Sequence, residues 1–361
     1  MMEENQPRPS APPKGLLKDN LFTFVLPGQT AEPRAGLNQA QEADRMGHRG
    51  IFLSERWESK EAGAMLGALA ASTERVTIVA GMTHCTTRHP LVQAGMAQTL
   101  QMLSGDRFVL GYGRGVPSLF RKLGIRVLSR EGMADHVAIM RKLWAGETVR
   151  YHGPAGDFPE MQLPSGYDRP PPVILGAIGP ESLKLGGAHF DGVALHPFLT
   201  ADGVARSIAI VKQAAQEAGR DPDRLTFWAT VVTAPDNLPE GNRIDIVEAR
   251  AVSYFMHDAI GHALAAANGW DPAPLRRVLE ADLARLEYGT GTIEDKRRMM
   301  ADAASLLPPE WLSSASAVGS ERQCLDTLGR YWAAGVDYIL LHGTTPVQQA
   351  GLFRELGKAA P

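Results

Sequence analysis

Residues 75–115, RVTIVAGMTHCTTRHPLVQAGMAQTLQMLSGDRFVLGYGRG, contain the pattern that decides the fold class of this chain. Residues 75–81 form a short apolar run rich in β-branched residues, which predicts a buried strand. Pro90 begins a predicted helix over 90–103, because proline suits the first turn of a helix. A second apolar run over 108–111 predicts another strand. A strand, a helix and a second strand in this order indicate a parallel βα unit.

The same alternation of strands and helices continues on both sides of this stretch. We count eight strands and therefore predict an α/β fold of the closed (β/α)8 TIM-barrel class, with an open doubly wound sheet as the alternative. The predicted strands are 21–26, 50–54, 75–81, 108–111, 172–176, 192–195, 225–232 and 336–341. The predicted helices between them are 34–47, 60–72, 90–103, 129–145, 181–189 and 202–218.

The connection between the last two predicted strands is much longer than the others. Its segment 244–307 is rich in alanine and helical in period, which predicts two or three extra helices that cover the barrel mouth or extend an interface. We assign residues 19–361 to one domain that includes this insertion. Residues 1–18 are rich in proline and polar residues, and we expect a disordered N-terminal tail.

Composition narrows the class of partner. The 37 Lys and Arg residues nearly balance the 40 Asp and Glu residues, so the chain lacks the basic excess of a nucleic-acid-binding protein. Only two cysteines occur, Cys85 and Cys324, which fits a reducing cytoplasm. No apolar run approaches the roughly 20 residues of a membrane helix. We expect a cytoplasmic protein that acts on a small-molecule substrate, without nucleic-acid or membrane partners.

The predicted site lies at the carboxyl ends of the strands, where barrels of this class place their chemistry. Glycine recurs at several of the predicted strand ends, where it lets the backbone approach a bulky ligand. The run LGAIGPES places a glycine turn and Pro180 at the start of a helix, where exposed N–H groups and the helix dipole favour a phosphate. An ordinary βα turn uses the same residue types and stays open as an alternative. The candidate phosphate-binding residues are Gly176, Ala177, Ile178, Gly179, Pro180, Glu181 and Ser182.

Two other motifs have less specific meanings. The run GYGRG over 111–115 is followed by Val116, so the dinucleotide fingerprint GxGxxG is not satisfied. It predicts a glycine-lined wall with Arg114 available to an anion, or a flexible loop with a solvated arginine. In Thr83-His84-Cys85, neighbouring side chains of an extended segment point in opposite directions, which disfavours a paired thiol nucleophile. The histidine spacings do not match a zinc motif, so we predict no metal site.

The motifs in 75–115 resemble the luciferase-like monooxygenase superfamily, specifically its coenzyme F420-dependent branch. The shared features are a third strand leading to R-H-P, a helix ending in L-S-G-D-R, and the glycine-rich L-G-x-G-x-G. Three further stretches are similar to the same branch, and the resemblance runs from about Leu21 to Leu356. These are REGMADHVAIMRKLWAGETVRYHG, PPVILGAIGPESLKLGGAHFDGVALHPF and AGVDYILL.

The resemblance implies an F420-dependent oxidoreductase that transfers hydride between the deazaflavin and a small organic substrate. It implies a non-prolyl cis peptide at Ala80–Gly81, in a bulge that backs the cofactor ring. Thr83 would contact that ring, Gly111 and Gly113 would line the cofactor channel, and 176–182 would hold the phosphate.

Several positions depart from the branch. Glu55 stands where relatives often carry Asp, and Arg56, which we also count among the cofactor-binding residues, replaces an active-site His with a permanent cation. Val116 and the Pro27-Gly28 pair stand where a sugar-phosphate dehydrogenase carries acidic groups, which makes glucose-6-phosphate oxidation doubtful. Glu55 and His84 remain the candidate catalytic acid/base groups.

Three other functions stay open. An FMN-dependent luciferase-like monooxygenase would use the same fold, and a cofactor-binding barrel without turnover would explain the missing acidic groups. A metal-dependent hydrolase is disfavoured by the histidine spacing. We expect a homodimer, although the apolar faces of 244–307 could equally form intramolecular core.

Overall fold

The computed structural model describes residues 18–27, 32–57, 59–164, 166–239, 242–243, 246–281 and 293–359. The predicted tail at 1–18 lies outside these residues except for Lys18, which begins a short 3-10 turn over Lys18–Asn20. No described helix is long and apolar enough to cross a membrane.

Eight parallel strands close into a barrel. The order β1-β2-β3-β4-β7-β8 continues through β9 to β11, and β11 pairs with β1, so the ring has no free edge. The predicted (β/α)8 barrel is therefore confirmed, and the open doubly wound alternative is wrong. The barrel strands are β1 (Leu21–Phe24), β2 (Gly50–Leu53), β3 (Thr77–Thr83), β4 (Phe108–Tyr112), β7 (Val173–Ala177), β8 (Gly192–Leu195), β9 (Thr226–Pro235) and β11 (Tyr338–His342).

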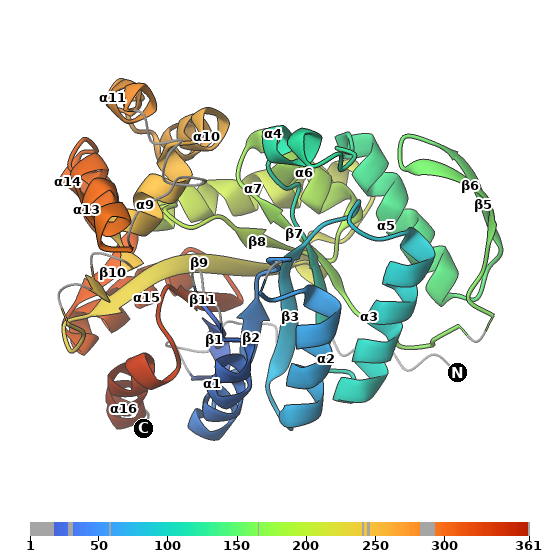
Figure 1. Ribbon diagram of the computed structural model, residues 1–361, viewed down its shortest axis with the longest axis horizontal. Helices are drawn as coiled ribbons and strands as arrows, with labels where there is room; N and C mark the ends of the chain where they lie inside the picture. The colour runs from blue at the N-terminus through green and yellow to red at the C-terminus, as the bar shows by residue number, and fades with distance from the viewer. Residues whose placement is uncertain are drawn as a thin grey trace.

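Helices surround the barrel (Figure 1), and six of them correspond to the helices predicted from the sequence, whereas the last two in the chain were not predicted. Gly47 ends the first of them with a left-handed φ of 83°, and the Ser129 side chain caps α5 by accepting a hydrogen bond from the Gly132 N–H. The helices packed around the barrel are α1 (Pro33–Met46), α2 (Ala62–Ser72), α3 (Pro90–Ser104), α5 (Arg130–Trp144), α6 (Pro180–His189), α7 (Ala201–Glu217), α15 (Glu321–Ala333) and α16 (Ala350–Ala359).

The apolar side chains form two separate clusters. One fills the barrel interior and includes Phe22, Phe52, Val109 and Trp228, each contributed by a different strand. The other lies between the strands and the surrounding helices and contains most of the buried residues. This division explains why the strands read as nearly continuous apolar runs, since both of their faces are buried.

Several elements were not predicted from the sequence. The segment after α5 forms an antiparallel hairpin of β5 (Val149–Gly153) and β6 (Gly156–Met161), and a short helix α4 (Pro117–Lys122) follows β4. The carboxyl half of β9 extends beyond the barrel and pairs with β10 (Ser316–Gly319). The insertion carries four described helices rather than two or three, followed by α14 (Pro309–Ser314). These four are α9 (Glu248–Phe255), α10 (Asp258–Asn268), α11 (Leu275–Glu280) and α13 (Ile293–Ala304).

Candidate functional site at the barrel mouth

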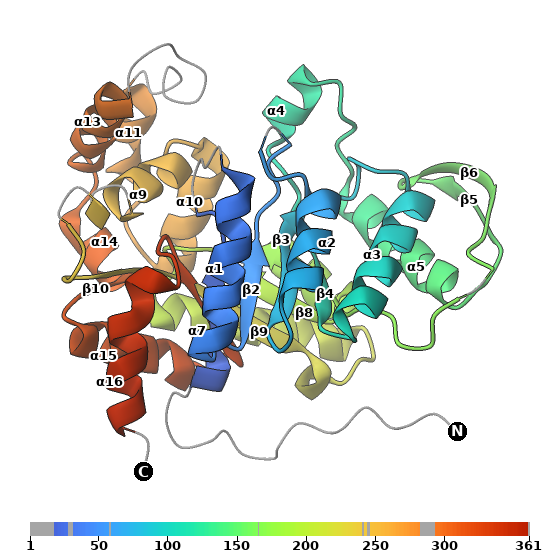
Figure 2. The same ribbon diagram turned by 60° about the horizontal axis from the view of Figure 1, so that its bottom comes forward.

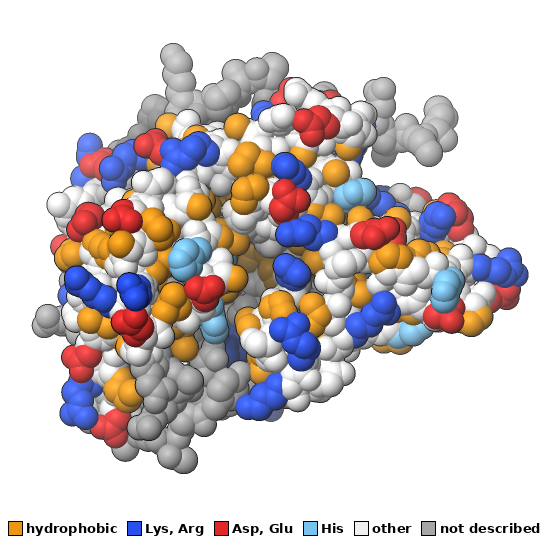
Figure 3. All heavy atoms as spheres, turned by 90° about the horizontal axis from the view of Figure 1, so that it is seen from above, with side chains coloured by type: hydrophobic (Ala, Val, Ile, Leu, Met, Phe, Trp, Pro, Cys, Tyr) orange, Lys and Arg blue, Asp and Glu red, His pale blue; other side chains and the backbone are white. Residues whose placement is uncertain are grey.

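The insertion helices and α4 stand at the same end of the barrel as the carboxyl ends of the strands (Figures 1 and 2). Seen from this end, the surface is hollowed near its centre, with hydrophobic side chains inside the hollow and charged and histidine side chains along its margin (Figure 3). The described candidate residues lie at or just after the ends of four strands that open into this mouth: Glu55 and Arg56 (β2), Thr83 and His84 (β3), Gly111 and Gly113 (β4), and 176–182 (β7).

An irregularity in β3 shapes one wall of the mouth. The pairing register of β3 with β4 shifts between Ala80 and Thr83, and the peptide bond Gly81–Met82 is cis. The cis bond expected at Ala80–Gly81 therefore lies one residue later than predicted. Gly81 packs closely against Phe52. A Cβ atom at this position would lie 2.1 Å from the Phe52 ring, so the bulge fits this packing only with glycine here.

Glu55 and Thr83 meet through a buried polar network that the sequence did not reveal. The Thr83 hydroxyl donates to Glu55 Oε2 at 2.6 Å, and the Arg88 guanidinium donates to both Glu55 oxygens, at 2.5 Å and 3.3 Å. Arg88 also contacts Glu61, which caps the start of α2. The Glu55 side chain is only 1% exposed and that of Arg88 is 13% exposed. The network thus ties the bulge of β3 to the loop after β2.

The ion pair between Arg88 and Glu61 shifts the pKa values of both groups. Burial alone would lower the pKa of Arg88, but its hydrogen bonds to Glu55 and Glu61 outweigh that effect and raise the pKa above its ordinary value. Burial would raise the pKa of Glu61, yet hydrogen bonds from the Ala64 N–H and Arg88 leave it below its ordinary value. Arg88 is therefore a permanent cation that lies between Glu55 and Glu61 and favours the ionised form of Glu61.

The glycines predicted to line a cofactor channel surround the Met82 side chain. A Cβ atom at Gly111 would lie 2.2 Å from the Ala80 carbonyl oxygen and 2.6 Å from Met82 Sδ. Cβ atoms at Gly113 and Gly176 would each come within 3.2 Å of Met82. The absence of side chains at these positions makes room for the bulge itself, as well as for any ligand beyond it.

His84 lies between the bulge and helix α4. Its Nδ1 donates to the Gly113 carbonyl oxygen at 3.1 Å, and its ring packs edge-on against Phe120 at 4.9 Å between centroids. Burial lowers the pKa of His84, so the ring is neutral near pH 7. Because Nδ1 carries the proton, Nε2 is left as an acceptor or base.

The predicted phosphate-binding run joins the end of β7 to the start of helix α6. β7 ends at Ala177, Gly179 is the N-cap of α6, and no side chain caps this helix end. A Cβ atom at Gly179 would meet nothing within 4 Å, so the space beside the helix start is open. The Ser182 hydroxyl donates to the Gly179 carbonyl oxygen at 2.9 Å and shapes the turn. These residues leave a helix N-terminus accessible to an anion.

A second group at the mouth combines His196, Tyr254 and His342. The rings of His196 and Tyr254 lie 4.5 Å apart, and the Tyr254 hydroxyl lies 3.4 Å from His342 Nε2. Burial lowers the pKa of His196 to about 4. Burial, together with Arg250, His196 and Lys60, lowers the pKa of His342 well below its ordinary value. His196 and His342 lie at the ends of predicted strands 192–195 and 336–341, whereas Tyr254 comes from α9 in the insertion.

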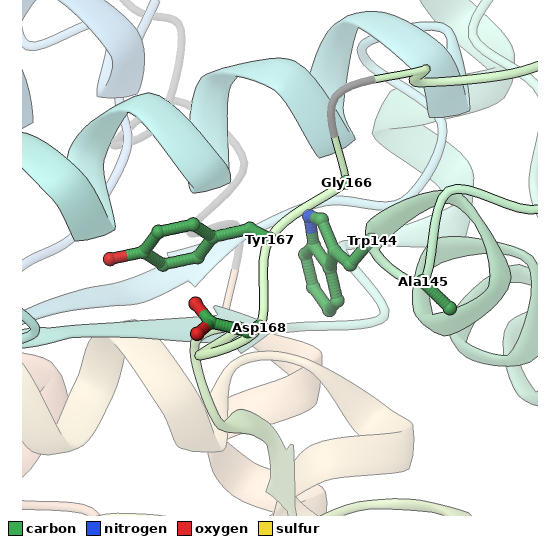
Figure 4. Close-up of a pocket in the computed structure, with 5 residues that line it drawn as sticks. All are labelled: Trp144, Ala145, Gly166, Tyr167 and Asp168. Atoms are coloured by element: carbon green, nitrogen blue, oxygen red, sulfur yellow. The ribbon is translucent and has the colours of Figure 1, made fainter.

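Other predicted or possible sites contribute less. Cys85 is buried, and burial raises the pKa of its thiol, which agrees with the low weight given to a nucleophilic thiol. Among the described residues, no three His, Cys, Asp or Glu side chains are grouped to hold a metal ion. A surface cavity of about 410 Å³ lies away from the mouth, beside the end of α5 (Figure 4). Its lining residues are Trp144, Ala145, Gly166, Tyr167 and Asp168.

These features define a (β/α)8 barrel whose candidate ligand site lies at the carboxyl ends of its strands. The chain belongs to the luciferase-like monooxygenase family, whose model matches residues 20–338. The predicted family is thereby confirmed.

Two curated relatives carry the same name, 5,10-methylenetetrahydromethanopterin reductase. The protein from Archaeoglobus fulgidus is 31% identical over 244 residues, which cover 62% of this chain and 71% of that protein. The protein from Methanolobus tindarius is 27% identical over 193 residues, which cover 53% of this chain and 58% of that protein. The chain thus spans little more than half the length of several curated relatives that it matches.

Solved structures show that the fold is shared. The coenzyme F420-dependent tetrahydromethanopterin reductase of Methanopyrus kandleri superposes with a TM-score of 0.75 at 18% identity, over 92% of this chain and 96% of that one. The oxygenating constituent of 3,6-diketocamphane monooxygenase of Pseudomonas putida, in complex with FMN, superposes with a TM-score of 0.63 at 21% identity. The alignment covers 95% of this chain and 94% of that one.

Proposed function

We propose that this protein is an F420-dependent oxidoreductase that transfers hydride between the deazaflavin and a small organic substrate. The observation that supports it most is the mouth itself, where the β3 bulge, a glycine-rich wall and an uncapped helix N-terminus lie at neighbouring strand ends. The curated relatives named above and an F420-dependent hydroxymycolic acid dehydrogenase relative support the choice of deazaflavin.

The residues present fit such a cofactor. Gly179 leaves open space at the start of α6, where backbone N–H groups would hold a phosphate. Arg114 is exposed at the end of β4, the strand next to β7, and would add a positive charge on that side. The bulge at Gly81 and Met82 would present backbone to one face of a planar ring. When bound, F420 would supply the hydride chemistry, and the protein would supply binding and orientation.

The polar groups of the mouth have separate roles in this proposal. Both oxygens of Glu55 are already bound by Arg88, Thr83 and the Ala62 N–H, so we assign Glu55 to positioning Thr83 beneath the ring. His84 keeps Nε2 as a base, and His196 likewise donates Nδ1–H to a carbonyl oxygen, of Pro197, at 2.9 Å. We propose that His84 accepts or returns the substrate proton, because it lies next to the bulge.

The first test is a paired titration of the purified protein with F420 and with FMN, followed by cofactor fluorescence and co-elution. We expect saturable binding of F420 and much weaker binding of FMN. Preferential binding of FMN, with oxygen consumption by the reduced flavin, would replace the proposal with the monooxygenase function. Binding of neither cofactor by folded protein would contradict both functions. F420 binding without turnover of any substrate in a broad panel would leave a cofactor-binding barrel.

We further propose that the protein is a homodimer that associates through the outer faces of α2 and α3. These helices lie side by side outside the barrel, and neither contains a charged residue (Figures 1 and 2). Val92, Met102 and Leu103 on α3 are each more than half exposed. In the insertion, by contrast, apolar residues such as Leu264 and Leu275 are buried within the chain. The expected interface therefore lies on α2 and α3 rather than on the insertion.

Leu103→Glu is expected to convert the dimer into a monomer, because it places a charge in an uncharged apolar interface. The molar mass measured by light scattering coupled to size-exclusion chromatography should fall from twice the 39.0 kDa chain mass to that mass. Val347→Glu is the matched control, since Val347 is 65% exposed and lies near α16. A wild-type protein that is monomeric at micromolar concentration, or a Leu103→Glu variant that stays dimeric, would contradict this interface.

A further inference from the structure

The mouth contains cationic and hydrogen-bonding groups that the proposed hydride transfer does not use. Arg250 and Tyr254 are four residues apart and share one face of α9. Tyr254 contacts His196, which follows β8, and His342, the last residue of β11. These residues, with Arg56 in the loop after β2, form a group that we call the cationic cluster: Arg56, His196, Arg250, Tyr254 and His342.

Two atoms of the cationic cluster are buried without a partner among the residues that the structure describes. They are Arg250 Nε and His342 Nδ1. His342 is only 5% exposed. When the Tyr254 hydroxyl donates its hydrogen to His342 Nε2, the neutral ring carries its proton on Nδ1. Both orphaned atoms are then N–H donors, and a buried donor without an acceptor is costly. Neither donor therefore has an acceptor among the described residues.

Lys60 and the arginines of the cationic cluster add positive charge around His342 and Tyr254. Arg250, His196 and Lys60 all act to lower the pKa of His342, in addition to its burial. Burial raises the pKa of Tyr254, while Arg250 and Arg56 oppose that rise. Within the described part of the chain, Glu55 pairs with Arg88, and Glu248 pairs with Arg243 through Oε1 at 2.9 Å. The other oxygen of Glu248, Oε2, is buried without a hydrogen-bond partner among the described residues.

We propose that the cationic cluster binds a carboxylate group of the substrate between Arg250 and His342. This inference rests on the proposed function and names its substrate class: an organic acid whose reacting carbon lies beside the cofactor ring. Phe24 packs against His342 at 4.6 Å between ring centroids and provides an apolar surface for the rest of such a molecule.

Calorimetric titration of cofactor-free protein tests this site independently of redox chemistry. The probes are acetate and benzoate, each compared with its uncharged amide, acetamide or benzamide. We expect the carboxylates to bind at least about tenfold more tightly than the amides, because hydrogen bonds to charged groups are the stronger ones. Equal affinity of acid and amide would overturn the proposal, even for a protein that binds F420 well.

Arg250→Gln should weaken benzoate binding by about tenfold to a hundredfold while benzamide binding stays unchanged. The matched control is Arg276→Gln on α11, where the arginine is 83% exposed and pairs with Glu280. Loss of binding in Arg250→Gln with a shifted melting curve would be checked with the smaller change His342→Gln. Retained acid selectivity in both variants would overturn the proposal.

The same titration with F420-loaded protein distinguishes two sources of anion. If the cluster serves the substrate, benzoate should bind to the loaded protein with similar affinity. Competition between benzoate and F420 would mean that the cluster holds an anionic group of the cofactor, and the substrate proposal would fall. A protein that selects carboxylates but does not bind F420 would retain the anion site and lose only the proposed function.

Discussion

Arg88→Met is expected to lower the free energy of unfolding by about 3 kcal/mol and to weaken cofactor binding strongly. Its guanidinium is the cation that faces the buried Glu55 carboxylate, and it also binds the Thr83 hydroxyl at 3.2 Å. Removing it leaves a buried carboxylate without its counter-charge, and this penalty exceeds the value of the lost hydrogen bonds. Urea unfolding and F420 titration measure the two effects.

The exposed pair Arg150–Glu160 on the β5–β6 hairpin provides the matched control. These side chains are 70% and 61% exposed, so Arg150→Met should change the free energy of unfolding by less than about 0.5 kcal/mol. Adding Glu55→Gln to Arg88→Met should restore part of the lost stability, because the amide carries no buried charge. Equal stability of the Arg88 and Arg150 variants would show that the buried pair does not hold this wall.

Gly111→Ala is expected to destabilise the protein by about 2 kcal/mol and to reduce F420 affinity at least tenfold. The added methyl group would lie 2.2 Å from a backbone oxygen, that of Ala80, which cannot rotate away as a side chain does. β3 must therefore move away from β4 where the bulge forms the wall of the mouth. Thermal unfolding and cofactor titration would be measured together.

Two other glycine variants provide a milder change and a control. Gly113→Ala meets only the Met82 side chain, at 3.2 Å, and should reduce F420 affinity less, which keeps the test informative if Gly111→Ala does not fold. Gly329→Ala lies within α15, has no atom within 4 Å, and should raise the free energy of unfolding by roughly 0.5–1 kcal/mol. A stable Gly111→Ala variant with normal F420 affinity would contradict the proposed role of the bulge.

The barrel could be predicted from the sequence because each barrel strand is a compact apolar run followed by a helical pattern. The hairpin β5–β6 escaped prediction because its burial pattern is broken and polar, as in Tyr151, His152 and Asp157. β10 consists of only four residues, Ser316–Gly319, and its pairing partner is the far end of β9. Such a strand depends on tertiary contact, which local propensity does not encode.

The positions of the candidate site residues could be predicted from the sequence, but the hydrogen bonds between them could not. Strand ends located Glu55, Thr83 and His84 at one face, because parallel strands end together. The hydrogen bonds that join Glu55 to Arg88 link residues 33 positions apart, with α2 and β3 between them in the chain, so no spacing rule could show them. Tyr254 and Arg250 lie in the insertion, whose helices could be predicted but whose orientation over the mouth depends on packing.

The pairing of β11 with both β9 and β1 has a consequence during synthesis. β11 begins at residue 338, so a nascent chain displays the open edges of β1 and β9 until almost the whole sequence has left the ribosome. Unpaired strand edges are templates for aggregation, and the segment from 236 to 337 must be translated while they persist. Recombinant yield should therefore depend on translation rate and chaperone supply more than the stability of the finished barrel would suggest.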